Sequence, residues 1–223
     1  MIKPSLRAGS HLSLLVAAVL ISTSAAYGAA PKPVILDTDI CDDIDDTRAI
    51  AVLLQSPELD CKLIVTALRD TEAKAKVVAK FLDKVGRTEI PVGIGVKQPG
   101  DSWRQTSWAR EYDLSSYPGR VCKDGIQAII DTIMNSPTRI TLIATGPLPN
   151  IAEALRREPR IAEKADFVGM HGSVYIGYSG KNKPDAEYNV AQNAEAAKKF
   201  AKRPTADQMR RTTYRAYRWP PYI

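Results

Sequence analysis

The chain has 223 residues, of which 44% are hydrophobic and 25% charged, a composition typical of a globular domain with a substantial core. Its formal net charge of +6 is unevenly distributed, because residues 31–197 carry 21 basic and 24 acidic side chains, a net of −3. This mildly acidic body excludes the basic stripe with which nucleic-acid-binding domains follow phosphates. The three cysteines are too few for a disulfide framework or a zinc site, and at most one bridge is expected among them.

The N-terminal segment has the layout of a secretory signal peptide. Lys3 and Arg7 form a basic start, residues 12–21 are an apolar run, and small residues follow. The apolar run is too short for a comfortable membrane span. We expect a signal peptide over 1–28, cleaved after Gly28, and a secreted or periplasmic mature protein without a membrane anchor. An uncleaved N-terminal anchor is the alternative.

The stretch Val34–Asp46 begins as a buried strand and ends in six carboxylates within ten residues. Anions this dense repel one another at neutral pH, so their pKa values rise or the turn unfolds unless a cation holds them. Oxygen ligands of this density suit a hard divalent cation such as Ca²⁺ or Mg²⁺. A solvated acidic turn that caps a helix is the alternative.

Strands and helices then alternate along the chain. Apolar periodicity predicts strands at 34–36, 62–67, 91–95, 140–144 and 167–170, and helices at 47–55, 72–85, 124–135 and 150–157. This alternation predicts an α/β fold, a mainly parallel Rossmann-like sheet flanked by helices. Ligands of such sheets lie beyond the C-terminal ends of the strands, so the polar residues that follow the strands should line one crevice.

The segment 97–120 has no clear periodicity and contains several aromatic residues, among them Trp103, Trp108, Tyr112 and Tyr117. A loop this long in a compact domain is usually functional or mobile. Its aromatic side chains could stack on a flat ligand or pack against the body of the domain.

Five residues suggest a cation-dependent site for a polyhydroxylated ligand. Asp39 at a strand end and Asp46 at a helix start could bind one cation from two sides, and the turn at Thr145 could add a backbone carbonyl. Glu187 and Asn189 would share one face of an extended segment, where a carboxylate and an amide suit the vicinal diol of a sugar.

Two rival motifs are testable from spacing. An EF-hand loop starting at Asp37 needs glycine at its sixth position and glutamate at its twelfth, where this chain has Asp42 and Arg48, so that motif is excluded. A strand followed by Asp-x-Asp also resembles haloacid-dehalogenase-type phosphohydrolases, with Asp37 as nucleophile and Asp39 as acid. That pattern prefers Thr or Val at the position of Cys41, and it remains the alternative.

Three motifs in order carry a second resemblance: Asp37–Asp46, Ile140–Ala152 and Ala186–Asn189. Over about residues 33–202 they resemble the inosine-uridine preferring nucleoside hydrolase family. The resemblance implies hydrolysis of the N-glycosidic bond of ribonucleosides to ribose and free base, as in purine and pyrimidine salvage. It further implies a small-molecule nucleoside substrate, a tightly bound Ca²⁺ and possible homo-oligomers.

The resemblance also implies roles for residues around the cation. Asp39 and Asp46 would ligate calcium through their side chains, and Thr145 through its carbonyl oxygen. Asp39 would in addition be the catalytic base that takes a proton from the attacking water.

Four residues would hold the sugar by the same resemblance. Asp45, Glu187 and Asn189 match positions that bind the ribose hydroxyls. Asp70 stands where the family often has an asparagine near the sugar.

The chain departs from the family pattern at several positions. The acidic loop has two more residues between Asp39 and Asp45 than the shorter family motif. Cys41 stands where glycine is usual, and His171 replaces a usual glycine, which we interpret as a packing substitution.

The largest departure is at the end of the sequence. Family members continue with further strands and a late His-Asp pair that supplies the last calcium ligand and the usual acid for the leaving base. Here the pattern stops after Lys202, and 203–223 is a basic tail without periodicity. We therefore expect a family domain over 31–202 that is truncated at its C-terminus. An inactive remnant that binds only Ca²⁺ and ribose is the alternative to an active hydrolase.

Overall fold

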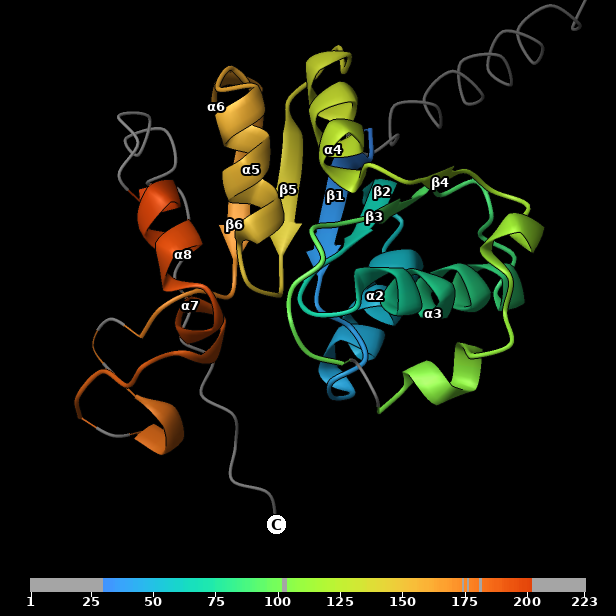
Figure 1. The fold of residues 1–223 in the computed structure, drawn as a ribbon. Helices are drawn as coiled ribbons and strands as arrows, with labels where there is room; N and C mark the ends of the chain where they lie inside the picture. The colour runs from blue at the N-terminus through green and yellow to red at the C-terminus, as the bar shows by residue number, and fades with distance from the viewer. Residues whose placement is uncertain (1–29, 102–103, 174, 176, 181, 202–223) are drawn as a thin grey trace, which may run out of the picture. The chain divides into compact units, whose positions relative to one another are not determined.

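The computed structural model describes residues 30–101, 104–173, 175, 177–180 and 182–201. The predicted signal peptide and the predicted basic tail lie outside these residues. The described chain contains a six-stranded sheet in the order β4-β3-β2-β1-β5-β6, with every neighbouring pair parallel (Figure 1). The strands are β1 (Lys32–Thr38), β2 (Leu59–Thr66), β3 (Val92–Ile94), β4 (Val121–Cys122), β5 (Ile140–Ala144) and β6 (Ala165–Gly169).

The strand order places a topological switch between β1 and β5. From β1 the chain proceeds outward through β2, β3 and β4, and then returns to the other side of β1 as β5. Loops after β1 and β5 therefore diverge, and open α/β sheets bind ligands at such a point. The acidic turn follows β1 and Thr145 follows β5, so both lie at this switch.

Helices cover both faces of the sheet. In β1, Val34 and Leu36 face one apolar core with α2 (Asp45–Gln55) and α3 (Thr71–Lys84), whereas Ile35 faces the other, because successive side chains of a strand point to opposite faces. The second face is covered by α4 (Gly125–Met134), α5 (Pro149–Arg157), α6 (Ile161–Lys164) and α8 (Ala194–Ala201). The remaining short elements are η2 (Thr106–Ala109), η3 (Leu114–Ser116), η4 (Tyr178–Gly180) and α7 (Tyr188–Gln192).

The predicted parallel α/β fold is confirmed. Strand 140–144 has the predicted bounds, and the other predicted strands and helices overlap observed ones. Asp70 caps α3 by accepting a hydrogen bond from the amide of Ala73 at 3.1 Å, and Gly86 follows the helix with a φ of +69°. These ends depend on local chemistry, which is why the sequence predicted them.

The segment 97–120 is more ordered than its sequence indicated, because it contains η2, η3 and β4. Tyr117 is buried and its hydroxyl donates a hydrogen bond to the carbonyl of Ile90 at 2.7 Å. Tyr112 bonds to Asp83 at 3.1 Å. These two aromatic residues pack against the domain, which leaves them unsuited to stacking on a ligand; Trp103 lies outside the described residues.

All three cysteines are free thiols. In the part of the chain that the structure describes, no helix is both long and apolar enough to cross a membrane.

The inner face of α3 is expected to dominate the packing of its side of the sheet. Leu82→Ala removes a fully buried side chain and should lower the free energy of unfolding by about 2–5 kcal/mol in urea titrations. Val52→Ala on α2, where the side chain is 66% exposed, is the matched control and should change it by about 0.5 kcal/mol or less. Equal losses in the two variants would contradict the assigned core.

Candidate functional site

The acidic turn, residues 39–46, lies at the topological switch between β1 and β5, and its first and last residues are buried. Asp39 is 8% exposed and Asp46, in the first turn of α2, is 7% exposed. Thr38 donates a hydrogen bond to Asp46 Oδ1 at 2.5 Å, and the hydroxyl of Thr145 donates to the same oxygen. Three predicted residues, Asp39 directly after β1, Asp46 in α2 and Thr145 directly after β5, thus meet at one place, which the sequence could only suggest.

Burial and mutual repulsion make this cluster hold protons. Burial, followed by the charge and a hydrogen bond of Asp46, raises the pKa of Asp39 to about 9. Burial raises the pKa of Asp37 to about 8, although the amide of Asn150 lowers it. Burial, and a hydrogen bond that its protonated carboxyl donates to Asp43, raise the pKa of Asp45 to about 7. The predicted rise of pKa values in a dense acidic turn agrees with these directions.

The donor set at the switch fits a hard cation in part. Asp39, Asp46 and the Thr145 carbonyl are all oxygen donors, the kind that calcium prefers, and the charge of Lys74 offsets the burial and repulsion of Asp39 only in part. Calcium takes about 6–8 oxygens, so water or ligand oxygens would complete such a site. Among the described residues, no three acidic, His or Cys side chains surround a single point as metal ligands.

Asn150 connects three strand ends and was not assigned a role from the sequence. It is fully buried at the start of α5 and donates hydrogen bonds to Asp37 Oδ1 at 3.1 Å and to the carbonyl of Thr66 at 3.0 Å. Its own oxygen accepts from the amide of Val96 at 2.7 Å. A polar residue that opens an amphipathic helix directly after a strand was the available signal.

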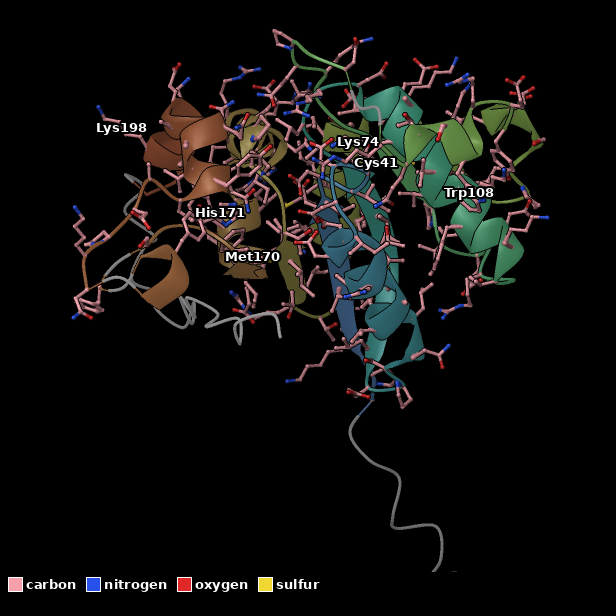
Figure 2. All side chains as sticks on the ribbon, turned by 90° about the horizontal axis from the view of Figure 1, so that it is seen from below. Cys41, Lys74, Trp108, Met170, His171 and Lys198 are labelled. Carbon is pink, nitrogen blue, oxygen red and sulfur yellow. The ribbon has the colours of Figure 1, made fainter. Side chains whose placement is uncertain are left out.

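Lys74 was also missed. This side chain lies on the inner face of α3 with 0% exposure, and its Nζ donates a hydrogen bond to the carbonyl of Asp39 at 2.7 Å. Burial lowers the pKa of Lys74, while Asp42 and Asp39 oppose that shift. A lysine within the apolar stripe of a helix was the signal in the sequence. Figure 2 shows Lys74 and Cys41 close together near the centre of the molecule.

The inserted part of the acidic loop is held by Gln105 from the segment 97–120. Gln105 donates from Nε2 to the carbonyl of Asp43, donates from its amide to the carbonyl of Cys41 at 3.3 Å, and accepts from the Thr47 hydroxyl at 2.7 Å. Cys41 has a φ of +98°, a conformation that favours glycine, the residue that the family usually has there. These contacts fix the loop in spite of that strain.

The predicted extended segment at Glu187 and Asn189 is wrong. Glu187 precedes α7, and its carboxylate accepts the amides of Asn189 at 2.9 Å and Val190 at 3.0 Å, so that it starts a helix. Asn189 is buried and donates to the carbonyls of Thr145 and Met170, each at 2.8 Å. Asn189 is therefore joined to the end of β5, next to the proposed cation ligands.

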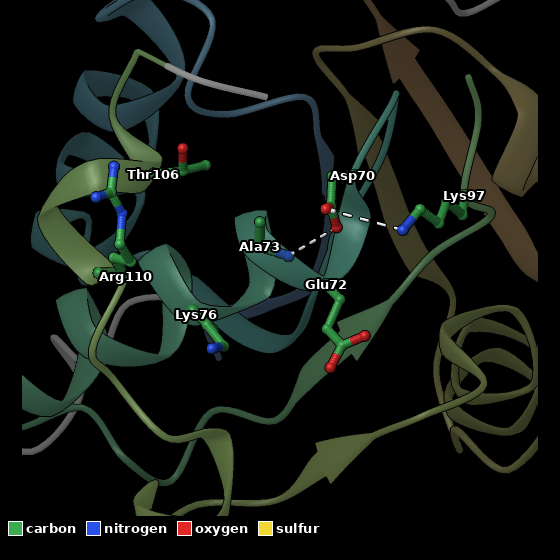
Figure 3. Close-up of a pocket in the computed structure, with 8 residues that line it drawn as sticks. Asp70, Glu72, Ala73, Lys76, Lys97, Thr106 and Arg110 are labelled. Atoms are coloured by element: carbon green, nitrogen blue, oxygen red, sulfur yellow. Dashed lines mark hydrogen bonds and ion pairs between the residues drawn. The ribbon is translucent and has the colours of Figure 1, made fainter. Parts of the chain in front are cut away.

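Asp70 faces a different pocket. This pocket of about 340 Å³ lies between α3 and η2 and is lined by Asp70, Glu72, Ala73, Lys76, Lys97, Thr106, Ala109 and Arg110 (Figure 3). Besides capping α3, Asp70 lies 3.8 Å from Lys97 Nζ. Neither the strand end of β1 nor that of β5 lines the pocket, so its chemistry differs from that of the acidic turn.

His171 joins the ends of β5 and β6. Its Nε2 lies 2.9 Å from the carbonyl oxygen of Gly146, and its ring is tilted against Phe167 at a centroid distance of 5.9 Å. Burial lowers the pKa of His171, which favours the neutral ring. These contacts agree with the packing role expected from the sequence.

The model of the inosine-uridine preferring nucleoside hydrolases matches residues 34–214 of this chain, which includes the whole acidic turn, Thr145 and the segment of Glu187. The chain belongs to this family. The matched range extends into the predicted basic tail.

Curated relatives agree with the family assignment. The inosine-uridine preferring nucleoside hydrolase of Leishmania major is 36% identical over 182 residues, 75% of this chain and 56% of that protein. A non-specific ribonucleoside hydrolase of Klebsiella pneumoniae is 34% identical over 177 residues, 75% of this chain and 57% of that protein. The chain thus spans little more than half the length of these relatives.

Solved structures of family members share the fold. A plant nucleoside hydrolase is 29% identical with a TM-score of 0.63, covering 76% of this chain and 56% of that one. An inosine-uridine preferring nucleoside hydrolase from Bacillus anthracis has a TM-score of 0.61 and covers 77% of this chain and 61% of that one, at 22% identity. The second comparison supports the fold alone.

Removing the Asn150 side chain should destabilise the strand ends. Asn150→Ala leaves the carboxylate of Asp37, the carbonyl of Thr66 and the amide of Val96 without this partner, at a cost of about 3 kcal/mol or more in free energy of unfolding. Chemical denaturation measures the loss. Asn135→Ala, at the exposed C-terminal cap of α4, is the control and should cost about 0.5 kcal/mol or less. Similar costs for both would contradict a central role for Asn150.

With divalent cations removed by a chelator, the free energy of unfolding should fall as the pH rises. Asp37 has a pKa of about 8 when folded and an ordinary value of 3.8, so the folded state keeps a proton that the unfolded state has lost. Stability therefore falls from about pH 4 to about pH 8. Thermal melts in EDTA at about pH 5 and about pH 8 measure the fall. Asp37→Asn, which cannot ionise, should reduce the pH dependence, and an unchanged slope would contradict the raised pKa.

Proposed function

We propose that this chain carries the cation- and ribose-binding half of a nucleoside hydrolase and hydrolyses the N-glycosidic bond of ribonucleosides with the help of Ca²⁺. The observation that carries the proposal is the meeting of Asp39, Asp46 and Thr145 at the switch between β1 and β5. The relatives that share these segments have names that describe nucleoside hydrolysis.

Asp39 and Asp46 would hold calcium with their carboxylates, together with the carbonyl of Thr145. A bound Ca²⁺ would supply the positive charge that keeps these carboxylates ionised and would make a nearby water more acidic. Asp39, once ionised, is the side chain placed to accept the proton of that water as it attacks the sugar carbon. The other carboxylates of the turn favour the positive charge that develops on the ribose ring as the base leaves.

The sugar would be held from two sides of the crevice. Asp45, on the first turn of α2, keeps part of its carboxylate open to solvent and is the group best suited to accept hydrogen bonds from ribose hydroxyls. The amide nitrogen of Asn189 is engaged by two carbonyls, so its oxygen is the atom left for a hydroxyl donor. Glu187 would bind a ribose hydroxyl from the start of α7. Asp70, which lines the pocket beside η2, would lie farther from the sugar than the other three residues.

A phosphohydrolase is disfavoured by the position of Asp37. A nucleophilic aspartate must reach its substrate, but Asp37 is fully buried, and its Oδ1 accepts a hydrogen bond from Asn150. The side chain of Asp37 instead stabilises the turn through its hydrogen bond with Asn150. Phosphatase activity lost in Asp37→Asn would favour the phosphohydrolase.

Turnover of a nitrophenyl riboside tests the proposal directly. This substrate has a leaving group that needs no acid, so Ca²⁺-dependent release should not depend on a residue that protonates the departing base. Asp39→Asn and Asp46→Asn should each lower kcat/KM by about a hundredfold or more. Asp131→Asn, on the exposed surface of α4, is the control and should leave it unchanged. Absence of turnover at saturating Ca²⁺ would indicate a remnant that is not catalytic.

The N-terminal sequence supports export of the mature chain to the periplasm or the exterior. A fusion of residues 1–30 to a reporter, followed by N-terminal sequencing of the exported product, tests this proposal and the cleavage site after Gly28. Association of copies, as proposed from the family, is measured by sedimentation.

A further inference from the structure

Lys74 is fully buried, although an apolar side chain of similar size would pack equally well at its position. The neighbours on the inner face of α3 are apolar, among them Ala75, Val78 and Leu82, all at 0% exposure. Taking an ammonium group out of water is unfavourable unless anions and hydrogen-bond acceptors compensate it. A methionine would fill the same space without that cost, so the charge itself needs an explanation.

The partners of Lys74 all belong to the acidic loop. Nζ donates to the carbonyl of Asp39 at 2.7 Å and lies 3.8 Å from Asp42 Oδ2. The nearby charges of Asp39 and Asp46 also act on it. Lys74 therefore contacts the backbone of one proposed calcium ligand and lies within the field of both.

Asp42 joins the acidic loop to two basic side chains. It belongs to the inserted part of the loop and lies 3.2 Å from the guanidinium of Arg69 as well as near Lys74. Arg69 is partly exposed, whereas Lys74 is enclosed, so Lys74 provides the charge that water screens least. The insertion thus introduces an anion that ties the loop to α3.

We propose that Lys74 is a positioning residue that preforms the acidic loop, holding the main chain at Asp39 and supplying a fixed positive charge before any metal binds. The inference rests on the proposed function, since the loop that Lys74 holds is the proposed calcium site. It assigns Lys74 to the site although it touches neither substrate nor the reacting atoms. The carboxylate of Asp39 then needs no large movement when a cation arrives.

Hydrogen exchange in calcium-free buffer tests the proposal. In Lys74→Met the amides of residues 38–46 should exchange about tenfold faster than in the wild type, while those of β5 stay unchanged, because one charged hydrogen bond and its charge are lost locally. Lys84→Met, an exposed lysine in the last turn of the same helix, is the control and should show no change in the loop. Unchanged loop exchange, or equal acceleration throughout the domain, would overturn the proposal.

A double variant separates charge from packing and remains informative if Lys74→Met folds poorly. Asp42→Asn combined with Lys74→Met removes both partners, so it should recover at least about half of the loss in Tm or in soluble yield. If Lys74 only fills space, the second substitution recovers nothing, and the inference fails.

Calcium titration separates this inference from the proposed function. Addition of CaCl₂ should raise the Tm of the wild type and should raise that of Lys74→Met by less, because in the variant calcium binding must also order the loop that Lys74 otherwise preforms. An equal or larger rise in Lys74→Met would contradict the positioning role of Lys74. If calcium raises neither Tm, the proposed function fails, whereas the exchange experiment in calcium-free buffer still decides the role of Lys74.

Discussion

The repulsion between buried carboxylates at the carboxyl end of β1 is the constraint on which the rest of the site depends. Asp37, Asp39 and Asp46 lie within one turn of chain and are all nearly closed to solvent. Water cannot screen them, so each either keeps a proton or acquires a compensating charge. The raised pKa values of Asp37 and Asp39 mean that these two carboxyls keep a proton in the absence of a cation. The oxygen atoms around Asp46 could instead bind a cation, which would supply the compensating charge.

The surrounding structure restrains this unfavourable arrangement through polar side chains from distant segments. Asn150 holds Asp37 from α5, Lys74 holds Asp39 from α3, and Gln105 holds the inserted loop from the segment 97–120. Each of these side chains bonds to the backbone or carboxylate of the turn. Strain such as the positive φ of Cys41 is stable in such a setting because its neighbours fix it from several sides.

Family membership and the geometry of the site support the same assignment for different reasons. The family match covers the motifs, whereas the structure brings Asp39, Asp46 and Thr145 to a switch point that the strand order creates. Asn189 extends the same cluster through its bond to the carbonyl of Thr145. The chain spans little more than half of its relatives, so their full activity is a hypothesis here and their fold is an observation.

The sequence by itself determined what depends on near neighbours. Apolar periodicity located the main strands and helices, Asp70 and Gly86 marked the ends of α3, and the density of acids after β1 predicted the rise of their pKa values. Only the tertiary structure decided what depends on contacts between distant segments. The carboxylate of Glu187 accepts the amide of Gly172, and Asn189 reaches the carbonyl of Thr145 at the end of β5. Lys74 becomes part of the site because α3 packs against the acidic loop. Contacts of this kind are set by the packing of the sheet and its helices, which no local pattern of residues encodes.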